Sequence, residues 1–318
     1  MATARDYDSL VRKYIDPKMT DNVYNSTPLL TRFKGKARVR ELADNHMLPL
    51  EIAEGLGGPY HDLDVIDRSR KPISDYAEFR LKEYYAPLTV SWRDRKIAKG
   101  PEDVVDILQK KARNAQKKLA KDLTSGIVSD GTTNTDHFVG LQRAIPDTAT
   151  TDSTAYGGIT GSATGKSFWN TQHQNKSSAT VTYADIVNMI TACSDGNDMP
   201  TIIATDKYIQ AYIWAVLLHP HERYNDGKIK TASGLPEVAG MPFITDAAFE
   251  SSGATGGRMY FFNEEYLRLW IHRRDNMKYW PFQLAADQFA WTARWTLSGF
   301  LGCDNRERQG LIYGIATS

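Results

Sequence analysis

One stretch of the sequence carries the residue types of a phosphate-binding loop. Residues 161–167 read Gly-Ser-Ala-Thr-Gly-Lys-Ser, and such a loop could hold nucleotide phosphates with its backbone N–H groups and its lysine. However, Gly161 lies one residue closer to Gly165 than the motif requires. The motif also needs a buried strand before it and a helix after it, whereas polar residues precede this stretch and no helical stripe follows it. Nucleotide binding here is therefore not predicted.

Other patterns that could support metal or nucleophilic chemistry are also incomplete. His219 and His221 flank a proline and precede Glu222, so they could bind a metal, but the proline removes a regular scaffold and no further ligand is evident nearby. A surface turn is the simpler interpretation. Glu264 and Glu265 fall in a predicted hairpin turn, where solvent exposure is expected, and no GxSxG, HExxH or GxGxxG motif occurs. We therefore predict no enzymatic activity, no metal and no cofactor.

The composition is that of an ordinary soluble globular protein. Of the 318 residues, 41% are hydrophobic and 24% are charged. The 39 basic and 38 acidic residues leave a formal net charge of +1, so the whole chain offers no electrostatic basis for binding nucleic acid or a membrane. No stretch approaches the roughly 18 apolar residues of a membrane span, and the N-terminus lacks an apolar signal segment. Cys193 and Cys303 lie far apart, which fits a reducing compartment, and Cys193 is expected to be a small core residue.

The first 34 residues read as an N-terminal arm. Apolar residues are sparse there, and the pairs Asp16-Pro17, Thr27-Pro28 and Lys34-Gly35 are expected to prevent any helix longer than residues 7–15. Arms of this kind usually pack on a neighbouring molecule or fray.

A long hairpin is expected next. Extended runs begin at Leu48 and at Tyr76, and a polar segment rich in Asp and Arg lies between them. If residues 55–80 pair as a hairpin, two limbs of about 12 residues reach about 40 Å, roughly twice the ~20 Å radius of gyration of a globule of this length. Two isolated strands are barely stable, so we expect this hairpin to pair with another molecule.

Residues 101–124 have the strongest helical pattern. Pro101 suits a first turn, and apolar residues recur at 3.6-residue spacing along one stripe: Val104, Leu108, Ala112, Ala115, Leu119 and Leu123. The other face carries six cations: Lys110, Lys111, Arg113, Lys117, Lys118 and Lys121. Solvated helix surface is the simpler interpretation of these cations, and a basic face toward packed nucleic acid is the alternative.

The rest of the chain predicts a linker, an α/β unit and a final strand. Residues 147–178 are rich in Thr, Ser, Gly and Asn and read as a long loop. Residues 181–274 alternate helical and extended patterns, with a helix capped by Thr182, a strand at 201–205, a helix at 206–218, and strands at 238–245, 258–262 and 266–271. Residues 288–298 alternate strictly, which predicts a half-buried strand with Trp291 and Trp295 on its buried face.

The order of these segments resembles that of the major capsid proteins of tailed bacteriophages, which have the Hong Kong 97-like fold. The resemblance covers nearly the whole chain and rests on the order and spacing of short stretches: Asn25-Ser-Thr-Pro-Leu-Leu30, Ile127-Val-Ser-Asp-Gly131, Phe138-Val-Gly-Leu-Gln-Arg-Ala-Ile145, Tyr156-Gly-Gly-Ile159, Val238-Ala-Gly-Met-Pro-Phe-Ile-Thr-Asp246 and Gly299-Phe-Leu-Gly-Cys-Asp-Asn-Arg306.

The resemblance implies an α+β fold in four segments. These are an N-terminal arm at 1–34, a peripheral domain at 35–180 with an extended E-loop at about 48–92 and a spine helix at about 101–124, an axial α/β domain at 181–274, and C-terminal strands at 275–318 that return to the peripheral domain. The E-loop would reach across a neighbouring subunit with Gly57, Gly58, Tyr60, Arg68, Arg70, Lys71 and Ile73. Lys71 there is expected to be a rim contact.

The family also implies partners and a location. The subunit would assemble with itself into the hexamers and pentamers of a shell, enclosing double-stranded DNA through weak, sequence-independent contacts. Because the chain has no room for a long helical segment before its arm, a separate scaffolding protein is expected, together with a portal. The expected location is the virion capsid after assembly in the host cytoplasm, with no membrane contact.

Three other functions remain open from the sequence. A shell protein of the encapsulin type, with the same fold, would enclose a protein cargo instead of a genome. An α/β small-molecule enzyme is supported only by the incomplete motif at 161–167. A single-stranded nucleic-acid binder would use Trp291, Trp295 and the basic residues of 110–121, but the strict alternation predicts that the tryptophans are buried.

Overall fold

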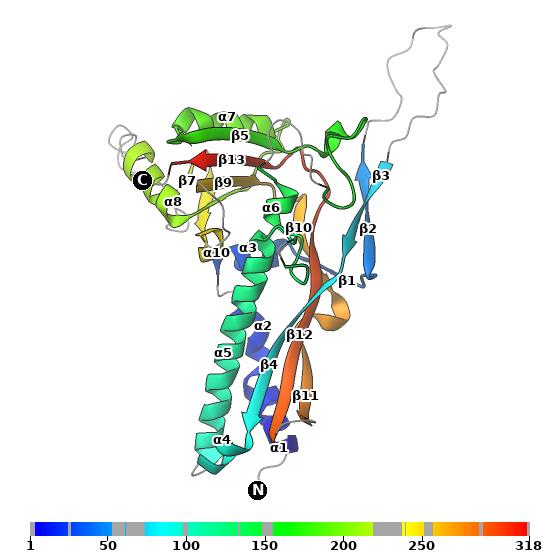
Figure 1. The fold of residues 1–318 in the computed structure, drawn as a ribbon, viewed down its shortest axis with the longest axis vertical. Coiled ribbons are helices and arrows are strands. Elements are labelled where there is room, and N and C mark those ends of the chain that lie inside the picture. Colours follow the sequence, from blue (N-terminus) through cyan, green and yellow to red (C-terminus); the bar gives the residue numbers. More distant parts are fainter. Residues whose placement is uncertain are drawn as a thin grey trace.

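The computed structural model describes residues 4–24, 27–52, 61, 74–97, 101–132, 134–147, 155–218, 237–238, 240–250, 257–285 and 289–316. The strands in these ranges form a long five-stranded sheet, a six-stranded sheet and a separate two-stranded sheet (Figure 1). The long sheet contains β1 (Arg38–Arg40), β10 (Leu267–His272), β12 (Ala290–Cys303), β11 (Lys278–Leu284) and β4 (Lys82–Ser91). The six-stranded sheet runs in the order β5 (Gln172–Ala179), β13 (Gly310–Ile315), β9 (Gly257–Phe262), β6 (Ile202–Thr205), β8 (Met241–Thr245) and β7 (Glu237–Val238).

The N-terminal segment is helical, which corrects the expectation of an arm with one short helix. It forms α1 (Ala4–Tyr14), α2 (Asp16–Tyr24) and α3 (Pro28–Lys36). The proline pairs separate these helices without ending the helical structure, because Pro17 and Pro28 lie in first turns, where no backbone N–H is needed. An apolar residue recurs at every fourth position and is buried: Tyr7, Val11, Ile15, Met19 and Val23.

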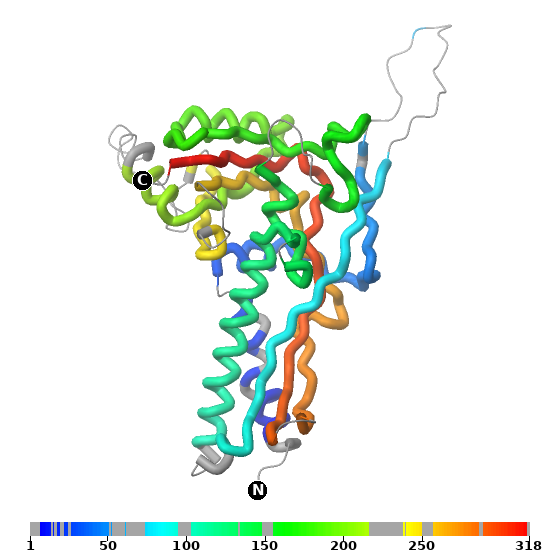
Figure 2. The backbone as a smooth tube through the Cα atoms, viewed as in Figure 1, coloured from blue at the N-terminus to red at the C-terminus, as the bar shows by residue number. Residues whose placement is uncertain are grey.

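These helices pack against other parts of the same subunit. The Asp8 carboxylate of α1 accepts hydrogen bonds from the Tyr279 hydroxyl at 2.7 Å and from the Phe282 backbone N–H at 2.9 Å. At the end of the segment, the Phe33 ring of α3 stacks on the Phe262 ring at 5.7 Å. The N-terminal helices therefore cover part of the long sheet and meet the six-stranded sheet (Figure 2).

The predicted helix at 101–124 is confirmed as α5 (Pro101–Val128), which spans about 42 Å and follows the short helix α4 (Trp92–Ile97). Its apolar stripe is buried from Leu108 to Leu123, and Val104 is partly buried. The helix continues beyond residue 124 because Ile127 and Val128 are also buried. Gly126 lies inside the helix. A Cβ at this position would lie 2.1 Å from the Tyr84 hydroxyl, so the missing side chain makes room for that hydroxyl.

The predicted strand at 288–298 is confirmed as β12, which extends farther, to Cys303. Ala293, Trp295 and Leu297 are buried on one face, as the alternation predicts. Trp291 is only partly buried, and Phe289, which precedes the strand, is 88% exposed. The burial of Trp295 contradicts its use as a base-stacking residue.

Residues 147–178, expected to be a long loop, contain ordered structure. The last part of the segment enters β5, which pairs in parallel with β13 at the edge of the six-stranded sheet. Before it, Tyr156 and the 3-10 turn η1 (Ser167–Trp169) pack around the fully buried Arg306. The Arg306 guanidinium donates hydrogen bonds at 2.8 Å to the carbonyl oxygens of Ala144 and Trp169. Ala144 ends α6 (Leu141–Ala144) and Trp169 ends η1, so Arg306 connects both elements to the chain between β12 and β13.

The α/β pattern after residue 181 is confirmed in most elements. Thr182 and Asp185 form the predicted capping box of α7 (Tyr183–Cys193), and Cys193 is buried. Burial alone would raise the pKa of Asp185, but hydrogen bonds from Lys176, Thr182 and Gln174 outweigh it and hold that pKa well below its usual range. The predicted helix at 206–218 changes from α8 (Lys207–Tyr212) to a π-helical segment, η2 (Ile213–Leu218).

The sheets divide the chain differently from the expected segments. β10 falls within the expected 181–274 unit but lies in the long sheet. Conversely, β5 and β13 lie outside that unit in sequence but belong to the six-stranded sheet. The remaining short elements are α10 (Ala247–Glu250) and η3 (Arg273–Asp275).

Glu264, expected to be exposed in a turn, is instead buried. Its carboxylate accepts a hydrogen bond from the Thr201 hydroxyl at 3.1 Å and lies 3.9 Å from the Arg32 guanidinium of α3. Burial raises the pKa of Glu264, although Arg32 counteracts the effect. The turn is buried because α3 packs over it, whereas Glu265 remains exposed.

The buried face of β12 should dominate the stability of the subunit. Trp295→Ala removes a fully buried ring whose centroid lies 5.5 Å from that of the Tyr279 ring, so we expect the free energy of unfolding to fall by about 3–5 kcal/mol. Phe289→Ala is the matched control, because its exposed ring should contribute less than about 0.5 kcal/mol. Urea unfolding of both variants would measure the difference, and equal midpoints would contradict the assignment of this face to the core.

Candidate interaction surfaces

The two-stranded sheet forms the base of the expected hairpin. β2 (Asn45–Glu51) pairs antiparallel with β3 (Ser74–Arg80), in register from Asn45 opposite Arg80 to Glu51 opposite Ser74. One face is buried through Leu48, Leu50, Ala77 and Phe79. The Phe79 ring stacks on Phe300 of β12 at 5.3 Å and meets Tyr156 edge-on at 5.1 Å. The strands are therefore fixed to the body of the subunit before they lead to residues 52–73.

The segment that resembles a phosphate-binding loop helps to hold this base. The Lys166 ammonium forms an ion pair with Asp75 of β3, and its hydrogen bond lowers the pKa of that carboxyl. The Glu78 backbone N–H also donates to the Gly157 carbonyl at 2.8 Å. Gly157 has a φ of +60°, and a Cβ there would lie 2.8 Å from the Ala77 Cβ, so the close approach needs glycine. Since Lys166 contacts a carboxylate and only a 3-10 turn follows it, the stretch does not form a phosphate cradle.

The opposite face of the hairpin base exposes apolar side chains. Met47 is 61% exposed and Tyr76 is 58% exposed, and Tyr76 stands opposite Pro49 in the register. The sequence reasoning did not single out these residues, although their alternation with the buried ones is visible in the sequence. The expected inter-subunit residues all lie outside the described residues, as do His219, His221 and Glu222: Gly57, Gly58, Tyr60, Arg68, Arg70, Lys71 and Ile73.

The structure divides the six cations of α5 into two groups. Lys110, Arg113, Lys117 and Lys121 are exposed and recur at three- or four-residue spacing, so they form one stripe opposite the buried face. We call these four residues the basic stripe. In the described part of the chain, none of them forms an ion pair.

The other two cations are neutralised within the subunit. The Lys111 ammonium pairs with Asp94 and donates to the Thr89 carbonyl at 2.9 Å, so it links α5 to α4 and β4. Lys118 pairs with Asp122, one turn farther along α5, at 2.7 Å. Burial raises the pKa of Asp94, but hydrogen bonds from Lys111 and Ser91 outweigh it and lower that pKa overall. Two of the six predicted surface cations therefore have a local partner.

Within the described ranges, no helix is both long and apolar enough to cross a bilayer. Those ranges also lack any group of three or more His, Cys, Asp and Glu side chains placed to hold a metal ion.

Comparison with known proteins identifies the fold. No model of a protein family matches the sequence, and no curated protein matches it. The structure resembles the cyanophage A-1(L) capsid subunit, with a TM-score of 0.66 and 14% identity over 91% of this chain and 92% of that one. It also resembles the capsid protein of a native GTA particle, with a TM-score of 0.59 and 12% identity over 89% of each chain. The SrpI encapsulin from Synechococcus elongatus gives a TM-score of 0.54 and 10% identity over 90% of this chain and 88% of that one.

The protein therefore has an α+β fold that it shares with these capsid and encapsulin subunits. More narrowly, it has the Hong Kong 97-like fold, and the resemblance inferred from the order of the sequence segments is confirmed at the level of the fold.

The division of the α5 cations predicts different effects for similar substitutions. Lys111→Gln removes the ion pair with Asp94, so we expect the free energy of unfolding to fall by about 1 kcal/mol. Lys117→Gln changes an exposed side chain of the basic stripe and should alter it by less than about 0.5 kcal/mol. Chemical denaturation of both variants tests this, and a larger loss for Lys117→Gln would show that the two groups are assigned incorrectly.

Proposed function

We propose that the protein is the major capsid protein of a tailed phage, a structural subunit without enzymatic activity that assembles into an icosahedral shell around double-stranded DNA. The observation that carries this proposal is the likeness to a phage capsid subunit over about nine-tenths of both chains. The subunit has an extended shape, with the six-stranded sheet at one end and the long sheet and α5 running together to the other (Figure 1). Such a shape leaves large lateral surfaces for neighbouring copies.

The segments would then have the following roles. Of the expected range 48–92, residues 82–91 form β4 of the long sheet, so the E-loop would be the part up to Arg80, which extends from the fixed β2–β3 base and lays its distal residues across a neighbour. Helix α5 would be the spine helix of the peripheral domain, and the six-stranded sheet with α7 would be the axial domain around the local symmetry axis. The exposed Met47 and Tyr76 support the E-loop assignment, because exposed apolar and aromatic side chains on a rigid strand are typical of protein interfaces.

The partners would be those of a phage head. Copies of the subunit would form hexamers and pentamers, and a separate scaffolding protein and a portal would complete the shell in the host cytoplasm before it becomes part of the virion. The basic stripe would face the genome. Duplex DNA carries about one charge per 1.7 Å, so a few unpaired cations per subunit provide weak, sequence-independent contact without tight binding.

An encapsulin-type compartment is the second candidate, because an encapsulin has the same fold. The two functions differ in what the shell contains, and that difference can be measured. Negative-stain microscopy of the purified protein should show shells or capsomers. Particles isolated from an infected or expressing host should contain double-stranded DNA for a capsid and a protein cargo for a compartment.

Removal of the distal hairpin tests the assembly role. Deleting residues 57–73 leaves residues 52–56 to connect β2 to β3, which is enough for a hairpin turn. Because β2 and β3 are held by contacts of their own side chains with Phe300 and Tyr156, we expect a folded, soluble subunit with unfolding stability within about 1 kcal/mol of the wild type. Shells and capsomers should be absent by microscopy and sedimentation. Shells formed by the shortened subunit would contradict the E-loop assignment.

Neutralising the basic stripe tests its interaction with DNA. Replacing Lys110, Arg113, Lys117 and Lys121 with glutamine should leave folding and assembly intact, since all four side chains are exposed. Genome retention across a salt series should become less dependent on salt, by about one unit of logarithmic slope for each phosphate that the stripe no longer neutralises. Lys118→Gln is the control, because Lys118 already pairs with Asp122. Retention identical to the wild type at every salt concentration would assign the stripe to ordinary solvated surface.

A further inference from the structure

A second concentration of positive charge lies where α3 turns into β1. Five cations occupy alternate positions with no acidic residue among them: Arg32, Lys34, Lys36, Arg38 and Arg40. β1 pairs in parallel with β10, and Arg38 stands opposite Trp270. Arg268 precedes Trp270 by two positions on the same face of β10, so the pairing brings Arg268 next to Arg38 although the two are far apart in the sequence.

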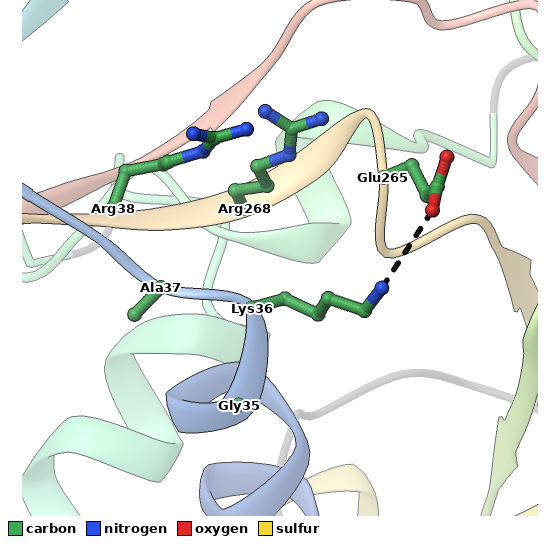
Figure 3. Close-up of a pocket in the computed structure, with 6 residues that line it drawn as sticks. All are labelled: Gly35, Lys36, Ala37, Arg38, Glu265 and Arg268. Atoms are coloured by element: carbon green, nitrogen blue, oxygen red, sulfur yellow. Dashed lines mark ion pairs between the residues drawn. The ribbon is translucent and has the colours of Figure 1, made fainter.

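Three of these cations, Lys36, Arg38 and Arg268, line a surface pocket of about 380 Å³ at the edge of the long sheet, together with Glu265. The guanidinium groups of Arg38 and Arg268 lie side by side and point in the same direction (Figure 3). Lys36 extends along the pocket toward Glu265, and the two charged groups are 3.6 Å apart. β1 is an edge strand, so the pocket opens at a border of the subunit that a neighbouring molecule can reach.

The guanidinium groups in this pocket lack sufficient acceptors. The Arg268 side chain is only 19% exposed, and Asp304 Oδ2 is its nearest carboxylate oxygen, at 4.0 Å from Nη1, which is too long for a hydrogen bond. Among the described residues, the guanidinium of neither Arg268 nor Arg38 donates a hydrogen bond. Both guanidinium groups still reach solvent, and two positive charges side by side with few protein acceptors attract an anion.

The net charge of the pocket indicates which kind of ligand it would bind. Lys36, Arg38 and Arg268 contribute three positive charges, and Glu265 and Asp304 contribute two negative charges, so one monovalent anion would neutralise the pocket. A carboxylate meets this requirement and matches the planar fork of a guanidinium with two parallel hydrogen bonds. A nucleic-acid backbone matches it less well, because phosphates adjacent to the bound one would lie close to Glu265 and Asp304.

We propose that the pocket formed by Lys36, Arg38 and Arg268 binds the carboxylate of an acidic side chain from a neighbouring copy of this chain. The inference rests on the proposed shell function, in which a second copy is the molecule that borders every lateral edge of the subunit. It identifies the edge strand β1 and the turn at Glu265 as an assembly contact separate from the hairpin.

The test compares shell assembly by the full-length wild type, by the double variant R38Q/R268Q and by R274Q. Arg274 is the matched control, because its 75% exposed side chain already pairs with Glu41 at 3.1 Å. We expect the protein concentration needed for half-maximal assembly, measured by sedimentation without nucleic acid, to rise at least tenfold for the double variant and to stay unchanged for R274Q. Circular dichroism and thermal unfolding establish whether the subunit is folded. If the double variant unfolds, the single variant R38Q serves, because Arg38 is exposed.

The outcomes separate this inference from the function on which it rests. Normal assembly by the folded double variant, alongside wild-type shells, would overturn the pocket contact and leave the capsid function standing. Normal assembly with reduced genome retention would show that the pocket binds phosphate, which also overturns it. If the wild type forms no shells, the proposed function fails and the inference fails with it. A tenfold loss restricted to the pocket variant supports the proposal.

Discussion

The pairing of β12 with three strands is the constraint on which the rest of the structure depends. β12 bonds to β4 over residues 290–299, to β11 over 291–296 and to β10 over 299–303. β4 continues directly from the hairpin, β10 carries the edge strand β1, and β11 holds helix α1 through Asp8. Trp295 fills the buried side of this junction. A single strand therefore joins the N-terminal helices, α5 and the hairpin base into one unit, so force on the hairpin is transmitted to the whole long sheet.

The junction of the two large sheets uses polar groups where the long sheet uses apolar packing. Arg306 satisfies carbonyl oxygens of two loops, and burial leaves Glu264 with a raised pKa close to Arg32. A buried charge with incomplete partners is a weak source of stability, but its removal without compensation is costly. The placement of the two sheets against each other therefore depends on these few polar side chains.

The sequence predicted elements with strong local periodicity and missed those that depend on distant pairing. α5 and β12 follow from their apolar spacing, and the capping box of α7 follows from Thr182 and Asp185. β5 could not be found in this way, because QHQNKSSA is polar and becomes a strand only by pairing with β13, more than a hundred residues later. Glu264 is buried because α3 covers it, which no local pattern reveals. The N-terminal helices did have a signal, the four-residue recurrence from Tyr7 to Val23, which the proline pairs obscured.

The net charge of the chain is only +1, but its charged side chains are unevenly distributed. The cations of the basic stripe have no partner in the described part of the subunit, and the β1 pocket holds one cation more than it holds acids. Because the whole chain carries only +1, other surfaces must carry a matching excess of acids. Water and counterions solvate these exposed charges, and such a distribution also favours contact with copies of the same chain or with a polyanion. Uniformly mixed charges would favour a soluble monomer, whereas segregated charges favour ordered contacts. Dissolved salt screens the exposed cations of the basic stripe more than the partly buried Arg268 of the pocket. In the proposed shell, the pocket would therefore supply the stronger contact between subunits, and the basic stripe the weaker contact with the contents.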